Sequence, residues 1–131
     1  MSVHFPGEDQ SNAARRTVAR QEPLALRTFT PSQMVLARSS GVFHWTPEGR
    51  RLYDYSSGVL VANLGHNPLR WMRRLAAYMG WNSELLSDRI ESRQDGQFFS
   101  AAPLTAYNAI TPVEAQAVER LEKNVQSCRG G

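Results

Sequence analysis

The chain has 131 residues, of which 41% are hydrophobic and 21% are charged, and its formal net charge is +3. This length suffices for one domain with a modest core, and nothing in the composition requires a second domain. No apolar stretch approaches the roughly 18 residues that cross a bilayer, and no run of about five like charges forms a nucleic-acid-binding tail. We therefore expect neither a membrane span nor a nucleic-acid partner.

The N-terminal residues 1–22 are polar and show no regular hydrophobic period, which is typical of a flexible arm. A short helix over residues 12–20 is the alternative for this segment. The folded segment is then expected at residues 23–131. Cys128 is the single cysteine, so a disulfide within the chain is impossible, and a reducing, cytoplasmic compartment is expected.

A β-hairpin is predicted next. Residues 42–45 form an apolar and aromatic run, residues 46–49 (Thr-Pro-Glu-Gly) are turn-forming, and a second apolar run follows at residues 52–55. An earlier strand at residues 34–38 is expected to join this hairpin through a turn at residues 39–41. The sheet is therefore small and antiparallel.

A helix over residues 68–81 should follow the hairpin, because Asn67 and Pro68 suit an N-cap and a first helical position. Its arginines at 70, 73 and 74 are read as a solvated face rather than a phosphate-binding stripe, because apolar residues fill the opposite face. Those apolar residues are Leu69, Met72, Leu75, Ala76 and Met79.

The C-terminal helix begins at a capping box, Thr111-Pro112-Val113-Glu114, and is expected to end near Ser127. Between the two long helices, a short helix at residues 83–90 and a loop at residues 93–103 are expected. The predicted fold class is α+β, with a small antiparallel sheet and two or three helices. The buried stripe predicted for the C-terminal helix consists of Val113, Ala117, Val118, Leu121 and Val125.

Several uncommon features occur in fixed order over residues 41–68, GVFHWTPEGRRLYDYSSGVLVANLGHNP. They are a Gly-aromatic strand, an acidic-Gly turn, a tyrosine-containing strand, a Ser-Gly step, and Leu-Gly-His before a proline-led helix. This order resembles the N-terminal part of the class III aminotransferases of the ornithine, acetylornithine, GABA and ω-amino-acid type. The resemblance extends over residues 30–85, with a weaker echo at residues 104–125.

Two positions depart from the family pattern. His66-Asn67-Pro68 stands where the family usually has His-x-His-Pro, and Thr46-Pro47 replaces the aspartate that commonly precedes the acidic-Gly step. These departures weaken the assignment to a particular subgroup more than they weaken the resemblance to the family.

The resemblance implies the N-terminal part of a fold type I subunit that depends on pyridoxal 5'-phosphate. Such an enzyme transfers an amino group from an amino acid or amine to a keto acid, and the family implies a homodimer. By resemblance, the substrate pocket includes Ser57, Gly58, Val59 and Leu60. Valine at position 59 would give this pocket an apolar wall. The alternative for Val59 and Leu60 is a buried strand end that packs against a helix.

Transamination through pyridoxal phosphate requires a lysine that forms a Schiff base with the cofactor. Lys123 is the only lysine, and it lies on a predicted helix with no glycine or turn beside it. A surface role is expected for it, and no catalytic residue is assigned. In the family, the catalytic lysine and the phosphate loop belong to a large domain that we expect to be absent here. The chain alone is therefore expected to be inactive; the alternative function is a small stand-alone α+β binding or interaction module.

A metal site is not expected from the spacing of the histidines. His66 is not at ligand spacing from His4 or His44, and no cysteine or acidic cluster joins them, so a capping or packing role is expected for it. Asp54 and Glu48 are expected to be exposed hairpin residues.

Overall fold

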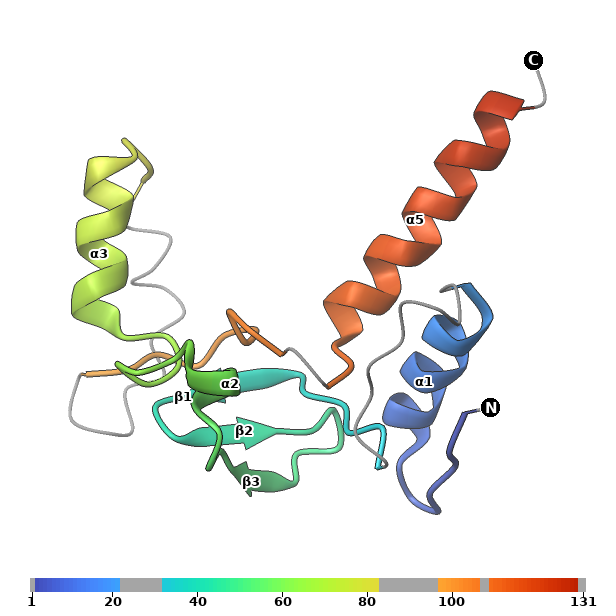
Figure 1. The fold of residues 1–131 in the computed structure, drawn as a ribbon, viewed down its shortest axis with the longest axis horizontal. Helices are drawn as coiled ribbons and strands as arrows, with labels where there is room; N and C mark the ends of the chain where they lie inside the picture. The colour runs from blue at the N-terminus through green and yellow to red at the C-terminus, as the bar shows by residue number, and fades with distance from the viewer. Residues whose placement is uncertain (1, 22–31, 83–96, 107–108, 130–131) are drawn as a thin grey trace.

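The computed structural model describes residues 2–21, 32–82, 97–106 and 109–129 (Figure 1). The fold class is α+β, as predicted, with a three-stranded antiparallel sheet in the order β1-β2-β3. None of the described helices is long and apolar enough to span a bilayer. The elements in chain order are α1 (Asp9–Gln21), β1 (Arg38–Ser40), β2 (Phe43–Trp45), β3 (Arg51–Tyr53), α2 (Ser57–Leu60), α3 (Leu69–Tyr78) and α5 (Pro112–Arg129).

The predicted hairpin is present as β2 and β3. The Gly49 N–H donates to the Thr46 carbonyl at 2.9 Å, and Gly49 has φ of 84°, so the turn uses the residue that adopts this conformation with least strain. The predicted strand at residues 34–38 is displaced: the paired strand is β1, and Val35 makes only an isolated parallel bridge with Ile110. The reason is the two-residue turn at Gly41, whose φ of 57° sets the register of β1 against β2.

Residues 1–22 were expected to form a flexible arm, but most of them form a packed helix. The alternative helix over residues 12–20 is present and extends over Asp9–Gln21 as α1, which packs against α5. The sequence does not show a hydrophobic pattern for α1, because a charged residue, Arg15, is buried in it. The Arg15 guanidinium has hydrogen-bond partners there: it donates to the Gln33 carbonyl at 2.8 Å and to Glu8 at 2.7 Å. The apolar core cluster at this end of the molecule consists of Ala14, Val18, Val35, Ile110 and Ala115.

Helix α3 starts one residue later than predicted, and Asn67 is not its N-cap. Asn67 has φ of 55°, and its side-chain amide instead donates to the Ser39 carbonyl at 2.8 Å. Pro68, in an extended conformation, occupies the N-cap position without a side-chain cap. The asparagine therefore ties the start of α3 to the sheet.

The capping box of α5 is confirmed. The Glu114 N–H donates to Thr111 Oγ1 at 3.0 Å, and the Thr111 N–H donates to Glu114 Oε2 at 3.1 Å. The predicted buried stripe of α5 is wrong, because the helix projects away from the sheet (Figure 1): Val113 is 58% exposed and Leu121 is 62% exposed, whereas the buried residue Ala115 lies outside the stripe.

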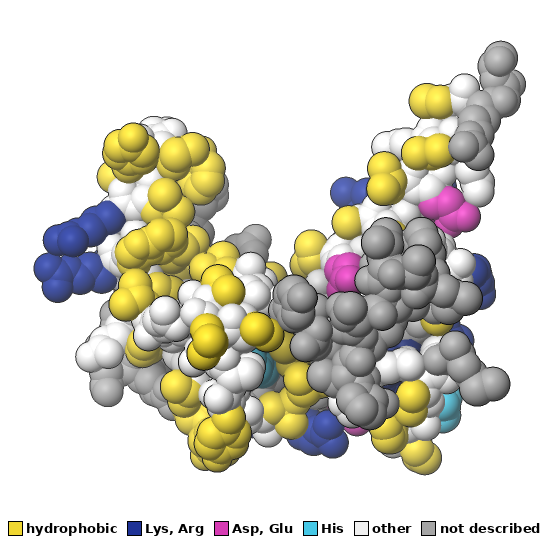
Figure 2. Space-filling model, in the orientation of Figure 1, with side chains coloured by type: hydrophobic (Ala, Val, Ile, Leu, Met, Phe, Trp, Pro, Cys, Tyr) yellow, Lys and Arg dark blue, Asp and Glu magenta, His cyan; other side chains and the backbone are white. Residues whose placement is uncertain are grey.

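Helices α3 and α5 stand at opposite ends of the sheet, so their apolar faces do not cover each other (Figure 1). Hydrophobic side chains are visible on both helices in Figure 2. On α3, Leu69 and Ala76 are buried, whereas Trp71 and Tyr78 are exposed. The short helix predicted at residues 83–90 lies outside the described residues.

Candidate functional site

Three side chains from separate segments meet beside the sheet. Asp54 follows β3, His44 lies in the middle of β2, and His66 lies in the loop before α3. Asp54 Oδ2 lies 2.7 Å from His66 Nε2 and 3.5 Å from His44 Nε2. The two imidazole rings have centroids 4.5 Å apart. We call these three residues the His-Asp-His cluster.

Backbone pairing explains how the cluster assembles. His44 stands opposite Ser39 in the β1–β2 register, and Ser39 Oγ lies 2.6 Å from His44 Nδ1. The loop that carries His66 is pinned to the β1–β2 turn, because Gly41 and His66 exchange N–H to carbonyl hydrogen bonds of 2.9 Å and 2.8 Å. Both histidines are consequently fixed in position on the same carboxylate.

The cluster is buried and electrostatically coupled. Burial alone would raise the pKa of Asp54, but hydrogen bonds from His66 and Ser56 outweigh it and hold that pKa well below its usual range. Burial lowers the pKa of His44, and the neighbouring His66 lowers it further, so Asp54 compensates only in part. The carboxylate is therefore the fixed negative charge of the cluster.

The same carboxylate also organises α2. Asp54 Oδ1 accepts from the Ser56 N–H and from Ser56 Oγ, both at 2.8 Å, and Oδ2 accepts from the Gly58 N–H at 3.0 Å. Residues 57–60 then form a single left-handed turn with φ of 50°, 57°, 61° and 65°. Left-handed backbone costs about 1–2 kcal/mol for each residue with a Cβ, and it is rarest for β-branched side chains such as Val59.

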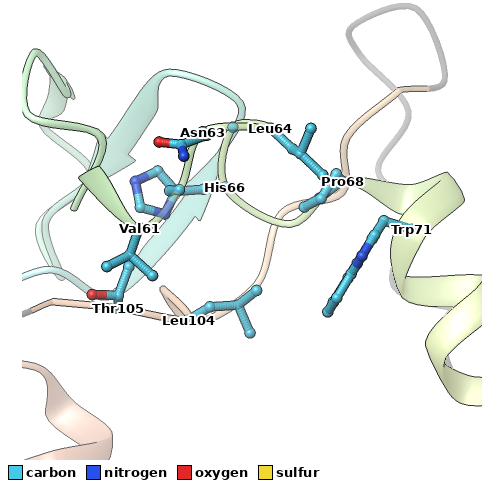
Figure 3. Close-up of a pocket in the computed structure, with 10 residues that line it drawn as sticks. Val61, Asn63, Leu64, His66, Pro68, Trp71, Leu104 and Thr105 are labelled. Carbon is cyan, nitrogen blue, oxygen red and sulfur yellow. The ribbon is translucent and has the colours of Figure 1, made fainter. Parts of the chain in front are cut away.

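Two cavities flank the cluster. One, of about 420 Å³, is lined among others by His44, Asp54, Gly58 and Val59. The other, of about 360 Å³, is lined by His66 and, as Figure 3 shows, by apolar side chains from the loop, α3 and the segment before residue 106. Thr105 lines both cavities, and the His-Asp-His cluster contributes to the wall of each.

Only two of the four residues predicted to line a substrate pocket border one of these cavities. Gly58 and Val59 line the 420 Å³ cavity, whereas Ser57 and Leu60 line neither of the two cavities. The alternative of a buried strand end is wrong, because Val59 is 47% exposed, Leu60 is 78% exposed, and both belong to the left-handed turn. Contact of these residues with a substrate stays a prediction.

The expectations for Asp54, Glu48 and His66 need correction. Asp54 is buried in the cluster, and His66 is joined by both a histidine and an acidic group that the sequence spacing did not reveal. Glu48 is not a free hairpin residue, since it accepts from the Ser11 N–H at 2.8 Å and from Ser11 Oγ at 2.6 Å. The Ser39–His44 pair depends on the displaced strand β1, because Ser39 was predicted to lie in the turn at residues 39–41, and the Asp54–His66 pair depends on loop geometry.

Lys123 lies on the exposed surface of α5. Its side chain is 71% exposed, and its Nζ pairs with Glu119 Oε1 at 3.1 Å, one helical turn away. The sequence holds no other lysine. A covalent site for pyridoxal phosphate therefore does not fit this chain.

Comparison with known proteins supports the aminotransferase resemblance. The acetylornithine aminotransferase of Xanthomonas campestris pv. campestris is 30% identical over 122 residues, covering 88% of this chain and 26% of the relative. That of Xanthomonas axonopodis pv. citri is 33% identical over 95 residues, covering 67% of this chain and 21% of the relative. The mitochondrial ornithine aminotransferase of Drosophila melanogaster is 35% identical over 48 residues, or 37% of this chain and 11% of the relative.

The chain spans about a quarter of the length of the X. campestris relative. No family model and no solved structure matches it. The chain is thus partially homologous to acetylornithine and ornithine aminotransferases.

Proposed function

We propose that this chain is the N-terminal portion of a class III aminotransferase that depends on pyridoxal phosphate and transfers an amino group from an amino acid or amine to a keto acid. The match to the acetylornithine aminotransferase over 88% of this chain carries the proposal. The complete enzyme is proposed to be a cytoplasmic homodimer.

The strained turn at residues 57–60 supports a functional role for this region. Backbone strain of this kind persists where the surroundings hold it in place, and it concentrates at binding sites. Here the Asp54 carboxylate and the packing of Gly58 against Thr105 hold the turn beside the 420 Å³ cavity. Val59 would then supply the apolar wall that meets the substrate side chain, with Ser57 and Leu60 in the same turn.

The chemistry itself is assigned to the rest of the enzyme. Lys123 is exposed and ion-paired, and no other lysine exists to hold the cofactor covalently. We therefore propose that the isolated chain is inactive and contributes only to the substrate side of the site.

The first test mixes the purified chain with pyridoxal phosphate, reduces the mixture with borohydride and maps adducts by mass spectrometry. We expect at most low, non-stoichiometric labelling, equal to the background of the Lys123→Arg variant. A stoichiometric adduct at Lys123, together with turnover of an amino donor, would overturn the assignment of the chemistry to another segment.

The second test replaces the matching N-terminal quarter of the X. campestris enzyme with this chain. The chimera should transaminate, and Val59→Gln should change the ratio of kcat/KM values among amino donors by about 10- to 200-fold, the scale of a pocket contact. Val113→Gln is the matched control, because Val113 is an exposed valine on α5. If a folded chimera were no more active than the relative lacking this segment, the small binding module would be favoured instead.

A further inference from the structure

We propose that the His-Asp-His cluster is a binding site for a divalent transition metal ion such as Zn²⁺, with His44 Nε2, His66 Nε2 and Asp54 Oδ2 as the ligand atoms. One such ligand atom from each residue lies within 4.8 Å of the others. None of the three ligands is among the residues assigned to substrate contact, but Asp54 Oδ2 also accepts from the Gly58 N–H at 3.0 Å, and His44 and Asp54 line the same 420 Å³ cavity as Val59.

The distances are close to those that a metal ion requires. A tetrahedral Zn²⁺ with ligands at about 2.0–2.2 Å separates its ligand atoms by roughly 3.4 Å. Asp54 Oδ2 stands 3.5 Å from His44 Nε2 and 2.7 Å from His66 Nε2. An ion would fit if the Asp54 Oδ2–His66 Nε2 distance increased by less than about 1 Å and the proton shared by these two atoms were lost.

The ligands are already oriented by their neighbours. Ser39 Oγ at 2.6 Å from His44 Nδ1 provides the outer partner that metal-binding histidines usually have, and it leaves Nε2 facing Asp54. Ser56 binds the other oxygen of the Asp54 carboxylate, so Oδ2 faces the two imidazoles. A carboxylate beside two histidines in a buried site is the donor set that Zn²⁺ and its neighbours prefer.

The coordination sphere has room for a fourth ligand. His44 and Asp54 line the 420 Å³ cavity, from which water can reach an ion bound at the cluster. Two nitrogen ligands disfavour Mg²⁺ and Ca²⁺, which take oxygen ligands.

One feature limits the expected affinity. His66 Nδ1 is buried, and the described part of the chain offers it no hydrogen-bond partner. When Nε2 binds a metal, Nδ1 carries the proton, and an outer partner that is missing weakens binding by about 10- to 100-fold. We therefore expect weaker binding than at a site in which both histidines have an outer partner.

The test uses the full chain in a Cys128→Ser background, which removes the exposed thiol as a competing ligand. Chelator-treated protein is titrated with Co²⁺ and followed by visible d–d absorption, then by displacement with Zn²⁺. We expect one Co²⁺ per chain, displacement by Zn²⁺ and no displacement by millimolar Mg²⁺. Zn²⁺ should also raise the melting temperature. Absence of a stoichiometric Co²⁺ signal would overturn the proposal.

Variants locate the site. His44→Gln and His66→Gln should each weaken Co²⁺ binding at least about 100-fold, whereas His4→Gln, at an exposed histidine, should leave it unchanged. Ser39→Ala keeps all three ligands and should weaken binding by about 10- to 100-fold, so it tests the site even if a ligand variant fails to fold. Binding that persists in folded His44→Gln, or that Ser39→Ala leaves unchanged, would show that the ion lies elsewhere and would refute the assignment.

Discussion

The molecule has two buried centres of opposite character. Between α1 and α5, the core cluster is apolar and contains Val18 and Ile110, which are 0% and 1% exposed. Beside β2, the buried groups are polar: His66 and Asn67 are each 1% exposed, and Ser39 is 0% exposed. An apolar core depends on volume, whereas a polar centre depends on which hydrogen-bond partners remain. The first centre therefore stabilises the fold, and the second sets the geometry of the candidate site.

Truncation in the apolar centre should have the largest effect on stability. Ile110→Ala leaves a cavity between α1, α5 and Val35 in the segment before β1. The free energy of unfolding should fall by about 2–5 kcal/mol. The matched control is Leu121→Ala on the exposed part of α5, which should change it by less than about 0.5 kcal/mol. Urea unfolding measures both, and equal losses would contradict the separation of core from surface.

Asp54→Asn tests the polar centre without a change in volume. The substitution removes the charge and presents an amide N–H₂ to a site where Asp54 accepts from Ser56, Gly58 and His66. We expect a loss of about 1–3 kcal/mol, the range for leaving a buried polar group mispaired. Asp9→Asn, at the exposed start of α1, is the control and should be nearly neutral. Metal-free urea unfolding at neutral pH makes the measurement, and a neutral Asp54→Asn would show that the cluster does not depend on its carboxylate.

Gly58→Ala separates backbone strain from crowding. Gly58 has φ of 57°, and an added Cβ would lie 2.5 Å from Thr105 Cγ2. Gly7 also has positive φ, 77°, but its Cβ would meet nothing within 4 Å. Gly7→Ala should lose about 1–2 kcal/mol from backbone strain, and Gly58→Ala should lose more.

The Thr105→Ser background sharpens this measurement, because it deletes the methyl group that the new Cβ would meet. In that background, Gly58→Ala should approach the loss seen for Gly7→Ala, and a double-mutant cycle gives the difference. An unchanged loss would mean that strain alone explains the glycine.

Sequence alone predicted the parts of the fold that local chemistry determines. The Thr46–Gly49 turn and the Thr111–Glu114 capping box each depend on residues within one turn of backbone, and both are present. The C-terminal helix was predicted correctly, but its predicted buried stripe was wrong, because periodicity does not specify which face packs or against which partner. In the structure only the start of this helix packs, against α1.

The candidate site could not be predicted in the same way. The His-Asp-His cluster requires Asp54 to meet His66 across 12 residues of loop, and the left-handed turn between them leaves no periodic signal. The sequence pattern did not reveal helix α1 for a different reason. Asn12 and Arg15 are polar residues that are buried, and their side chains donate to the backbone carbonyls of Phe5 and Gln33. Buried polar groups conflict with hydrophobic patterning, so residues that pack through hydrogen bonds resemble exposed ones in the sequence.

The smallest expected effect concerns Glu48, which joins the hairpin turn to the start of α1. Burial would raise its pKa, but the two hydrogen bonds from Ser11 outweigh this, so the folded-state pKa lies below the ordinary value of 4.5. A depressed carboxyl pKa stabilises the fold fully above the unfolded-state value, and that contribution is lost as the pH falls through the folded-state pKa. The contribution should stay below about 1 kcal/mol, because Glu48 is partly exposed to solvent.

The measurement compares the unfolding free energies of wild type and Glu48→Gln from pH 7 downward. We expect the wild type to be more stable above pH 4.5, and the difference to shrink as the solution becomes more acidic than that value. Gln116→Ala, at an exposed position of α5, provides the control, because neither side chain titrates. A difference that instead grew on acidification would mean that the protonated form of Glu48 is the one that binds Ser11, and the hairpin would then be tied to α1 by a neutral hydrogen bond.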